Sequence, residues 1–148
     1  MAITTAMTTS FKQELFEALH DFNASGGNTF KIGLFKQTVT GTYGAATTNY
    51  STVTGNSDEA AGTGYSAGGT NLTNIDPTTS STTAFCDFSD VTWSTSTIDA
   101  DGAFIYNSTN GNRMVSVHDF GGTRSSSAGD FTIQFPTADA SNAILRLA

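Results

Sequence analysis

Residues 104–120 read FIYNSTNGNRMVSVHDF, and this stretch decides the fold. Asn110-Gly111 is a strong signal for a two-residue hairpin turn, because a type I′ turn needs positive φ at both central residues. Folding the segment about that turn places Phe104 opposite Val117 and Tyr106 opposite Val115. Since successive side chains of a strand point to opposite faces, these four apolar residues then share one face. The segment predicts two antiparallel strands with one register and one buried face.

The composition also indicates a β protein. The chain has 148 residues, is rich in threonine and serine, and contains 15 glycines, 11 phenylalanines and four tyrosines. Threonine is β-branched and suits strands, whereas glycine suits turns. The length fits a single domain with a real core. Charged residues make up only 13%, well below the usual share, which fits either a surface that packs against neighbouring proteins or an ordinary monomeric β domain.

The charge balance excludes some classes of partner. The net charge is −7, and the six lysines and arginines are scattered along the chain. Because neutralising phosphates requires clustered cations, we expect no direct binding to nucleic acid or to an anionic membrane surface. The first residues, MAITTAMTTS, lack the basic and apolar regions of a signal peptide, and no apolar run has membrane-spanning length. Cys86 is the only cysteine, which excludes an internal disulfide and fits synthesis in a reducing compartment.

One helix is predicted, over residues 10–23. Ser10 and Gln13 form a capping-box pattern, and apolar residues from Phe11 onward recur at three- and four-residue spacing. This arrangement places Glu14 on the polar side, and Gly26-Gly27 ends the helix. Such a helix either plugs one end or one face of a sheet or docks onto a partner protein.

The other predicted elements are strands. They cover residues 29–38, with Phe30, Ile32 and Leu34 pointing inward, and residues 49–54, 84–93, 131–135 and 142–147, while residues 96–101 lead into the hairpin. Gly-rich or polar connections are predicted over most of residues 41–83 and over residues 120–129. Short strands separated by turn signals predict one mainly β domain over residues 1–148. We expect an antiparallel β-sandwich or jelly-roll-like barrel with one N-terminal α-helix.

Residues 64–68, GYSAG, match the G-x-S-x-G pattern of a nucleophile elbow around Ser66. An elbow needs a strand before the serine and a helix after it. The following residues, GTNLTNIDPTT, have no helical period, so a Gly-rich strand or bulge is the better interpretation. We therefore predict that the chain is not an enzyme.

The remaining polar candidates are weak. His20 and His118 have no neighbours with the spacing of zinc ligands other than carboxylates. Asp99 and Asp101 resemble the start of a calcium loop, but the later ligands are missing, which leaves a weak ion site or a tight turn. Asp87, Asp90 and Asp119 could pair for acid–base chemistry, although no spacing argues for it. We predict no catalytic, cofactor-binding or metal-binding residues.

Five segments together resemble a family of small virion structural proteins of tailed bacteriophages. The resemblance rests on their order along the chain, and it covers most of the sequence: SFKQELFEALHDF (10–22), TFKIGLF (29–35), GTGYSAGGTNL (62–72), GAFIYNSTNGNRMVSVHDFGG (102–122) and AGDFTIQFPTADASNAILRLA (128–148). It implies a component of the phage particle, assembled in the cytoplasm of the bacterial host. It supplies no cofactor and no binding residues.

Two functions are compatible with these observations. The first is an outer capsid decoration (cement) protein, which would contact copies of itself and the major capsid protein and bridge capsomers. The second is a tail or fibre component that recognises host glycans. Stacking platforms for such glycans would be Tyr43, Tyr50, Tyr65 and Trp93, whose alternative role is packing in the core. The Thr- and Gly-rich residues 41–83 are the expected contact surface, because long loops are retained mainly where they bind.

Overall fold

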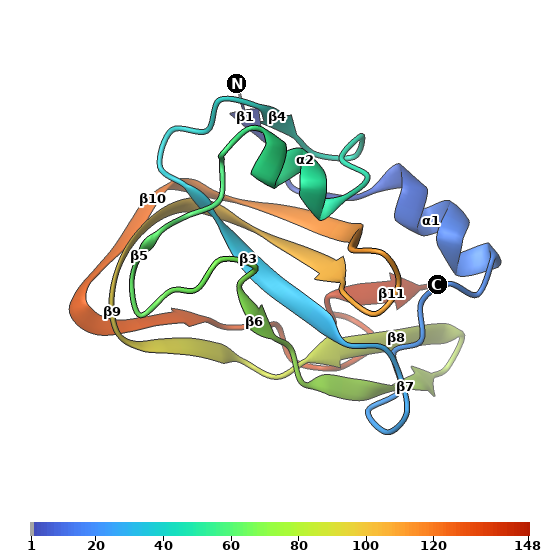
Figure 1. Ribbon diagram of the computed structural model, residues 1–148. Helices are drawn as coiled ribbons and strands as arrows, with labels where there is room; N and C mark the ends of the chain where they lie inside the picture. Colours follow the sequence, from blue (N-terminus) through green and yellow to red (C-terminus); the bar gives the residue numbers. More distant parts are fainter. Residues whose placement is uncertain (1) are drawn as a thin grey trace.

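The computed structural model describes residues 2–148, which fold into a mainly β structure with two short helices (Figure 1). The elements follow in chain order: β1 (Ala2–Ile3), β2 (Ala6–Met7), α1 (Thr9–Phe16), β3 (Phe30–Lys36), β4 (Thr42–Tyr43), α2 (Tyr50–Gly55), β5 (Gly62–Thr63), β6 (Thr70–Asn71), β7 (Asn74–Ser80), β8 (Thr83–Phe88), β9 (Val91–Asn107), β10 (Arg113–Ile133) and β11 (Leu145–Leu147). The predicted mainly β class is confirmed, although strands begin before residue 29 and a second helix is present.

Two antiparallel sheets form a β-sandwich-like fold. The larger sheet has the order β2-β10-β9-β3-β6, with β5 paired to β9, and the smaller has the order β11-β8-β7. A separate parallel pair joins β1 to β4. Figure 1 shows β9 and β10 curving together, so that one half of this hairpin runs beside β3 and the other half lies in the layer of β7 and β8.

The bend of the hairpin lies where β10 carries extra residues. Gly102 pairs with Asp119 and Ala100 pairs with Arg124, so residues 120–123 have only Asp101 opposite them. A bulge of this kind bends a strand and increases its twist. Gly121 and Gly122 supply positive φ values of 69° and 145° there. The prediction of a loop over residues 120–129 is therefore wrong, because these residues continue β10.

The turn of the hairpin differs from the predicted one. Phe104 pairs with Val117 as expected, but Tyr106 pairs with Met114, because a bulge at Val115 shifts the register. Residues 108–112 form the connection, and positive φ falls at Gly111 and Asn112. The buried side chain of Asn107 explains the longer loop: its Oδ1 accepts from the Asn110 backbone N–H at 3.1 Å, a local bond that competes with a two-residue turn.

The bulge divides the apolar residues between two cores. The sandwich core lies between the sheets, and the upper core lies on the opposite face of the β3-β9-β10 region, under α2. The inward prediction for Phe30, Ile32 and Leu34 on β3 is confirmed, since all three lie in the sandwich core. Val115, predicted to share a face with Phe104, Tyr106 and Val117, instead joins the sandwich core, and Met114 occupies that position in the upper core. The upper core comprises Phe35, Val39, Tyr43, Val53, Phe104, Tyr106, Met114 and Val117.

Helix α1 is shorter than predicted. Thr8, rather than Ser10, caps it, and its Oγ1 accepts from the Phe11 N–H at 3.3 Å. The helix ends at Phe16, and Ala18 has a φ of 55°, which a continuing right-handed helix does not allow. The residues expected to complete the helix, up to residue 23, instead form a connection that leads to β3.

Three further predictions need correction. Residues 49–54, predicted as a strand, contain most of α2, because the Asn49 side chain caps the helix by accepting from the Ser51 N–H at 3.0 Å. The predicted strand 84–93 is two strands, since β8 ends at Phe88 and β9 begins at Val91. Residues 96–101 lie inside β9, so Asp99 and Asp101 are strand residues and form no tight turn.

Candidate functional site

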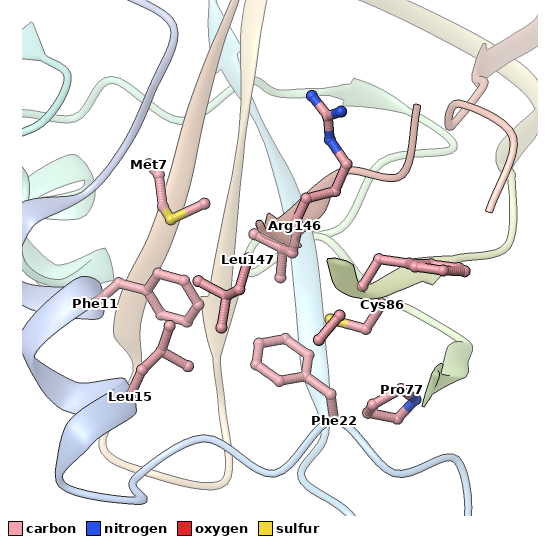
Figure 2. Close-up of a pocket in the computed structure, with 11 residues that line it drawn as sticks. Met7, Phe11, Leu15, Phe22, Pro77, Cys86, Arg146 and Leu147 are labelled. Atoms are coloured by element: carbon pink, nitrogen blue, oxygen red, sulfur yellow. The ribbon is translucent and has the colours of Figure 1, made fainter. Parts of the chain in front are cut away.

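The most apolar concavity of the described chain is a groove between α1 and strand β11. Its volume is about 170 Å³, and its wall is almost entirely carbon (Figure 2). We call it the α1–β11 groove. Its lining residues are Met7, Phe11, Leu15, Phe22, Pro77, Ala84, Phe85, Cys86, Leu145, Arg146 and Leu147.

Three parts of the chain, distant in sequence, form this groove. Phe11 and Leu15 are four residues apart on α1 and point the same way, as neighbouring turns of a helix require. Leu145 and Leu147 lie on β11, which pairs with β8 so that Leu147 faces Ala84. The final strand predicted over residues 142–147 is confirmed in shorter form.

The floor is buried and the mouth is open. Phe11, Phe22 and Cys86 are almost inaccessible to solvent, whereas Leu147 is 64% exposed. Burial, reinforced by the nearby charge of Asp87, raises the pKa of the Cys86 thiol to about 12. The thiol is therefore protonated at neutral pH and behaves as an apolar part of the floor.

Arg146 places the only cationic group of the groove at its rim. Figure 2 shows the guanidinium extending away from the apolar side chains. Its Nη1 donates to the backbone carbonyls of Ser141, at 2.6 Å, and Ala140, at 3.4 Å. These bonds hold the turn at residues 139–142 against β11 and fix the cation beside the mouth.

Phe16 ends α1 directly after Leu15, and its side chain is 94% exposed. The neighbouring Glu17 is also exposed and accepts from Gln13 Nε2 at 2.7 Å. A phenylalanine so fully in water is unusual, because burying its ring stabilises a protein by about 1.5–3 kcal/mol.

The elbow motif does not form a nucleophile site. Ser66 is exposed in a turn after β5, and no helix follows it. The structure instead uses the neighbouring residues to anchor this loop. Tyr65 donates its hydroxyl to Glu59 at 2.8 Å, and the Gly68 N–H donates to the same carboxylate at 2.7 Å.

His20 and His118 lie in separate environments. The imidazole of His20 is buried and contacts Glu14 at 2.8 Å, and Glu14 also accepts from Arg113 at 2.9 Å. Glu14 was expected on the polar side of the helix, but it is 6% exposed, because its carboxylate turns inward to contact the His20 ring and the Arg113 guanidinium. The three side chains join α1 to the hairpin.

His118 lies beside Ser116 on β10. Its Nε2 is 2.9 Å from Ser116 Oγ, and burial lowers its pKa to about 4. The histidine is therefore neutral at pH 7. No third residue in the described chain orients the ring by a hydrogen bond, so this pair does not form a complete catalytic triad.

The aspartates considered for ion binding or acid–base chemistry accept hydrogen bonds from backbone N–H groups and hydroxyls of other residues. Asp99 accepts from Ser125, and Asp101 from Thr38 and Thr123. Asp87 accepts from the N–H groups of Phe88 and Ile144, Asp90 from that of Phe135, and Asp119 from that of Gly121. Across residues 2–148, no group of three or more His, Cys, Asp or Glu side chains is placed to hold a metal ion.

The four aromatic residues considered as glycan platforms pack inside the protein. Tyr43 and Trp93 are 1% and 6% exposed. The ring of Tyr50 stacks on that of Tyr106 at 4.7 Å, and the ring of Tyr65 packs against Trp93 at 5.8 Å. Tyr43 and Trp93 therefore belong to the cores, whereas Tyr50 and Tyr65 are half-buried against them.

A buried carboxylate that the sequence reasoning missed is Asp58. It accepts from the Gly41 N–H and the Tyr43 hydroxyl, both at 2.7 Å, and from Thr40, and it lies 3.0 Å from Lys36 Nζ. Burial alone would raise its pKa, but the hydrogen bonds from Thr40, Tyr43 and Gly41 and the contact with Lys36 together place it below the ordinary value. Asp58 thus ties the start of β4 to the segment that follows α2.

No helix within residues 2–148 is long and apolar enough to cross a membrane. Comparisons with protein-family models, with curated proteins and with solved structures gave no match for this chain.

Proposed function

We propose that the protein is a non-enzymatic structural component of a tailed-bacteriophage particle and decorates the outer surface of the head. The observation that carries this proposal is the whole-chain sequence resemblance, joined to a surface suited to protein contacts. That surface includes the open α1–β11 groove and β7, where the residues 75–80 are all exposed and are mostly polar.

The charge of the protein supports an outer position. The net charge of −7 would be repelled by packaged DNA, whereas the outer surface imposes no such cost. Contacts with copies of itself and with the major capsid protein would hold neighbouring capsomers together. The mechanism is mechanical, since each copy adds contact area across a boundary between subunits and spreads internal pressure over more contacts.

The roles of the polar side chains support a structural function. Asp58, Glu59 and Glu14 each hold two or more segments of the chain together. Ser66 is exposed and makes no side-chain hydrogen bond within the described residues. Screening the purified protein against ester and glycoside substrates tests this point: turnover that disappears in Ser66→Ala would contradict it.

Imaging phage particles that lack this protein tests the head assignment. We expect heads that lose DNA or rupture more readily under heat or osmotic shock, with tails and adsorption unchanged. Normal heads combined with altered tails or lost adsorption would reject the cement function. That result would favour the tail component, the other function compatible with the sequence.

A further inference from the structure

Phe16 and Glu17 form a protruding corner at the end of α1. The phenyl ring is the most exposed of the large apolar side chains in the described chain, at 94%, ahead of Leu147 at 64% and Ile75 at 38%. Since the ring contributes almost nothing to the core, its retention in a folded monomer has no packing reason. Covering such a ring removes apolar surface from water, which favours association.

The α1–β11 groove has the size and chemistry to receive one such ring. Its volume is about 170 Å³ and its lining is almost wholly apolar. For comparison, a protein cavity of about 150 Å³ lined by apolar side chains binds benzene. The groove therefore has room for one phenyl ring.

The exposed ring of Phe16 lies beside the groove, because Phe16 is one residue further along α1 than Leu15 and about 100° round the helix axis from it. Helix α1 contributes Phe11 and Leu15 to the groove wall, and Phe16 is the next residue along it. A two-fold interface requires one self-complementary patch, in which residue i of one copy contacts residue j of the other and the reverse. The exposed Phe16 ring and the adjacent wall of the α1–β11 groove, both contributed by α1, provide such a patch.

The charges beside Phe16 and beside the α1–β11 groove have opposite signs. Glu17 follows Phe16, and Arg146 stands at the rim of the groove. Entry of Phe16 into the groove of a second copy brings the Glu17 carboxylate toward that copy's Arg146. This local complementarity matters because two chains that each carry −7 otherwise repel.

We propose that two copies associate through a two-fold axis beside α1, with Phe16 of each copy inserted into the α1–β11 groove of the other. Glu17 of each copy then pairs with Arg146 of its partner. This inference rests on the proposed function of a self-associating structural protein, and it names the residues of the contact.

Sedimentation equilibrium of the full chain tests the proposal. We expect the wild-type protein to form a dimer, and we expect Phe16→Ala to weaken the dimer at least about 100-fold, because two central aromatic residues are lost per interface. Ala84→Trp should weaken it similarly, because the new ring occupies the mouth of the groove. Arg124→Glu, which reverses an exposed charge on β10 away from the groove, serves as the control and should leave the dimer unchanged.

A charge exchange separates the contact from effects on folding. Arg146→Glu alone also removes the hydrogen bonds to Ala140 and Ser141, so its effect by itself has two explanations. Adding Glu17→Arg restores the dimer only if these residues meet across the interface. Circular dichroism checks that Phe16→Ala keeps the fold, as its exposure predicts.

Three outcomes overturn the proposal: a wild-type monomer at about 1 mM, a dimer that Phe16→Ala leaves intact, or a charge exchange that does not restore association. None of these three outcomes determines the result of the experiment on particles that lack the protein. Heads weakened by loss of a protein that is monomeric in solution would reject this interface and keep the proposed function.

Discussion

Replacing Asp58 with alanine should destabilise the protein by about 3–5 kcal/mol, the range found when one partner of a buried charged network is removed. The side chain of Asp58 is fully buried and holds residues 40–43 against α2. In the variant, the Tyr43 O–H and the Gly41 N–H lose their acceptor, and each unsatisfied donor costs about 1–3 kcal/mol. Thr40 and Lys36 add less, because Thr40 is exposed and the Lys36 side chain is 32% exposed and also bonds the Ser57 carbonyl.

Urea unfolding followed by fluorescence measures this change, with the midpoint expected to fall and the slope to stay constant. Asp130→Ala is the matched control, since that carboxylate is exposed and accepts one long bond from the Thr95 N–H. It should change stability by less than about 0.5 kcal/mol. Tyr43→Phe should fall between the two, at about 1 kcal/mol.

The decrease of stability at acidic pH provides a second measurement. The pKa of Asp58 is lower in the folded protein than its ordinary value of 3.8. Its contribution to stability is therefore present above that pH and is lost as the pH falls below it. If the free energy of unfolding of Asp58→Ala lies within 1 kcal/mol of the wild-type value, the hydrogen bonds of Asp58 do not hold residues 40–43 in place, and our account of this region is wrong.

Val117→Asp should prevent folding, because Val117 is 0% exposed in the upper core and an unpaired buried charge is very costly; a folded, soluble variant in a circular dichroism and proton NMR check would contradict the Phe104–Val117 register. Native Cys86 should react with a thiol reagent far more slowly than in urea, because burial raises its pKa to about 12, and equal rates would show that the groove floor is open. Stability should also fall as the pH drops from 6.5 toward 4, because the pKa of His118 is lowered to about 4 and the unfolded chain binds the proton first; urea titrations of His118→Gln should lose part of that slope.

Local alternation predicts those parts of this fold in which one face of a strand is buried. Phe30, Ile32 and Leu34 were identified as inward residues because their period-two pattern needs no knowledge of partners. The Phe104–Val117 pair was identified from the turn signal. The same reasoning missed the bulge at Val115, because a bulge depends on which side chains two different cores can accept.

Tertiary contacts explain the other differences. Helix α1 ends early because Ala18 takes a positive φ and the chain turns to place His20 between Glu14 and Asn107, a residue 87 positions later. Asn49 caps helix α2 within a stretch whose threonines favour a strand. Residues 120–129 look like a loop by composition, yet they continue β10, and four of them (Arg124, Ser125, Ser126 and Gly129) pair with β9.

The groove could not have been predicted, since it exists only because β11 pairs with β8 beside α1. One signal was available in the sequence: the apolar stripe predicted for α1 leaves Phe16 outside it. Likewise, nothing in the spacing of Lys36, Thr40 and Asp58 indicates that they meet around one buried carboxylate.

The long, bent hairpin also sets the order in which a growing chain can fold. β2 pairs only with β10, and β3 pairs with β9 and the two-residue β6, so the first forty residues leave the ribosome long before their main partners exist. At about 5–20 residues per second, several seconds separate the synthesis of β3 from that of β10. The two phenylalanines and the single leucine of β3 are therefore made well before β9, their main partner strand, and we expect the larger sheet to assemble only once both arms of the hairpin are complete.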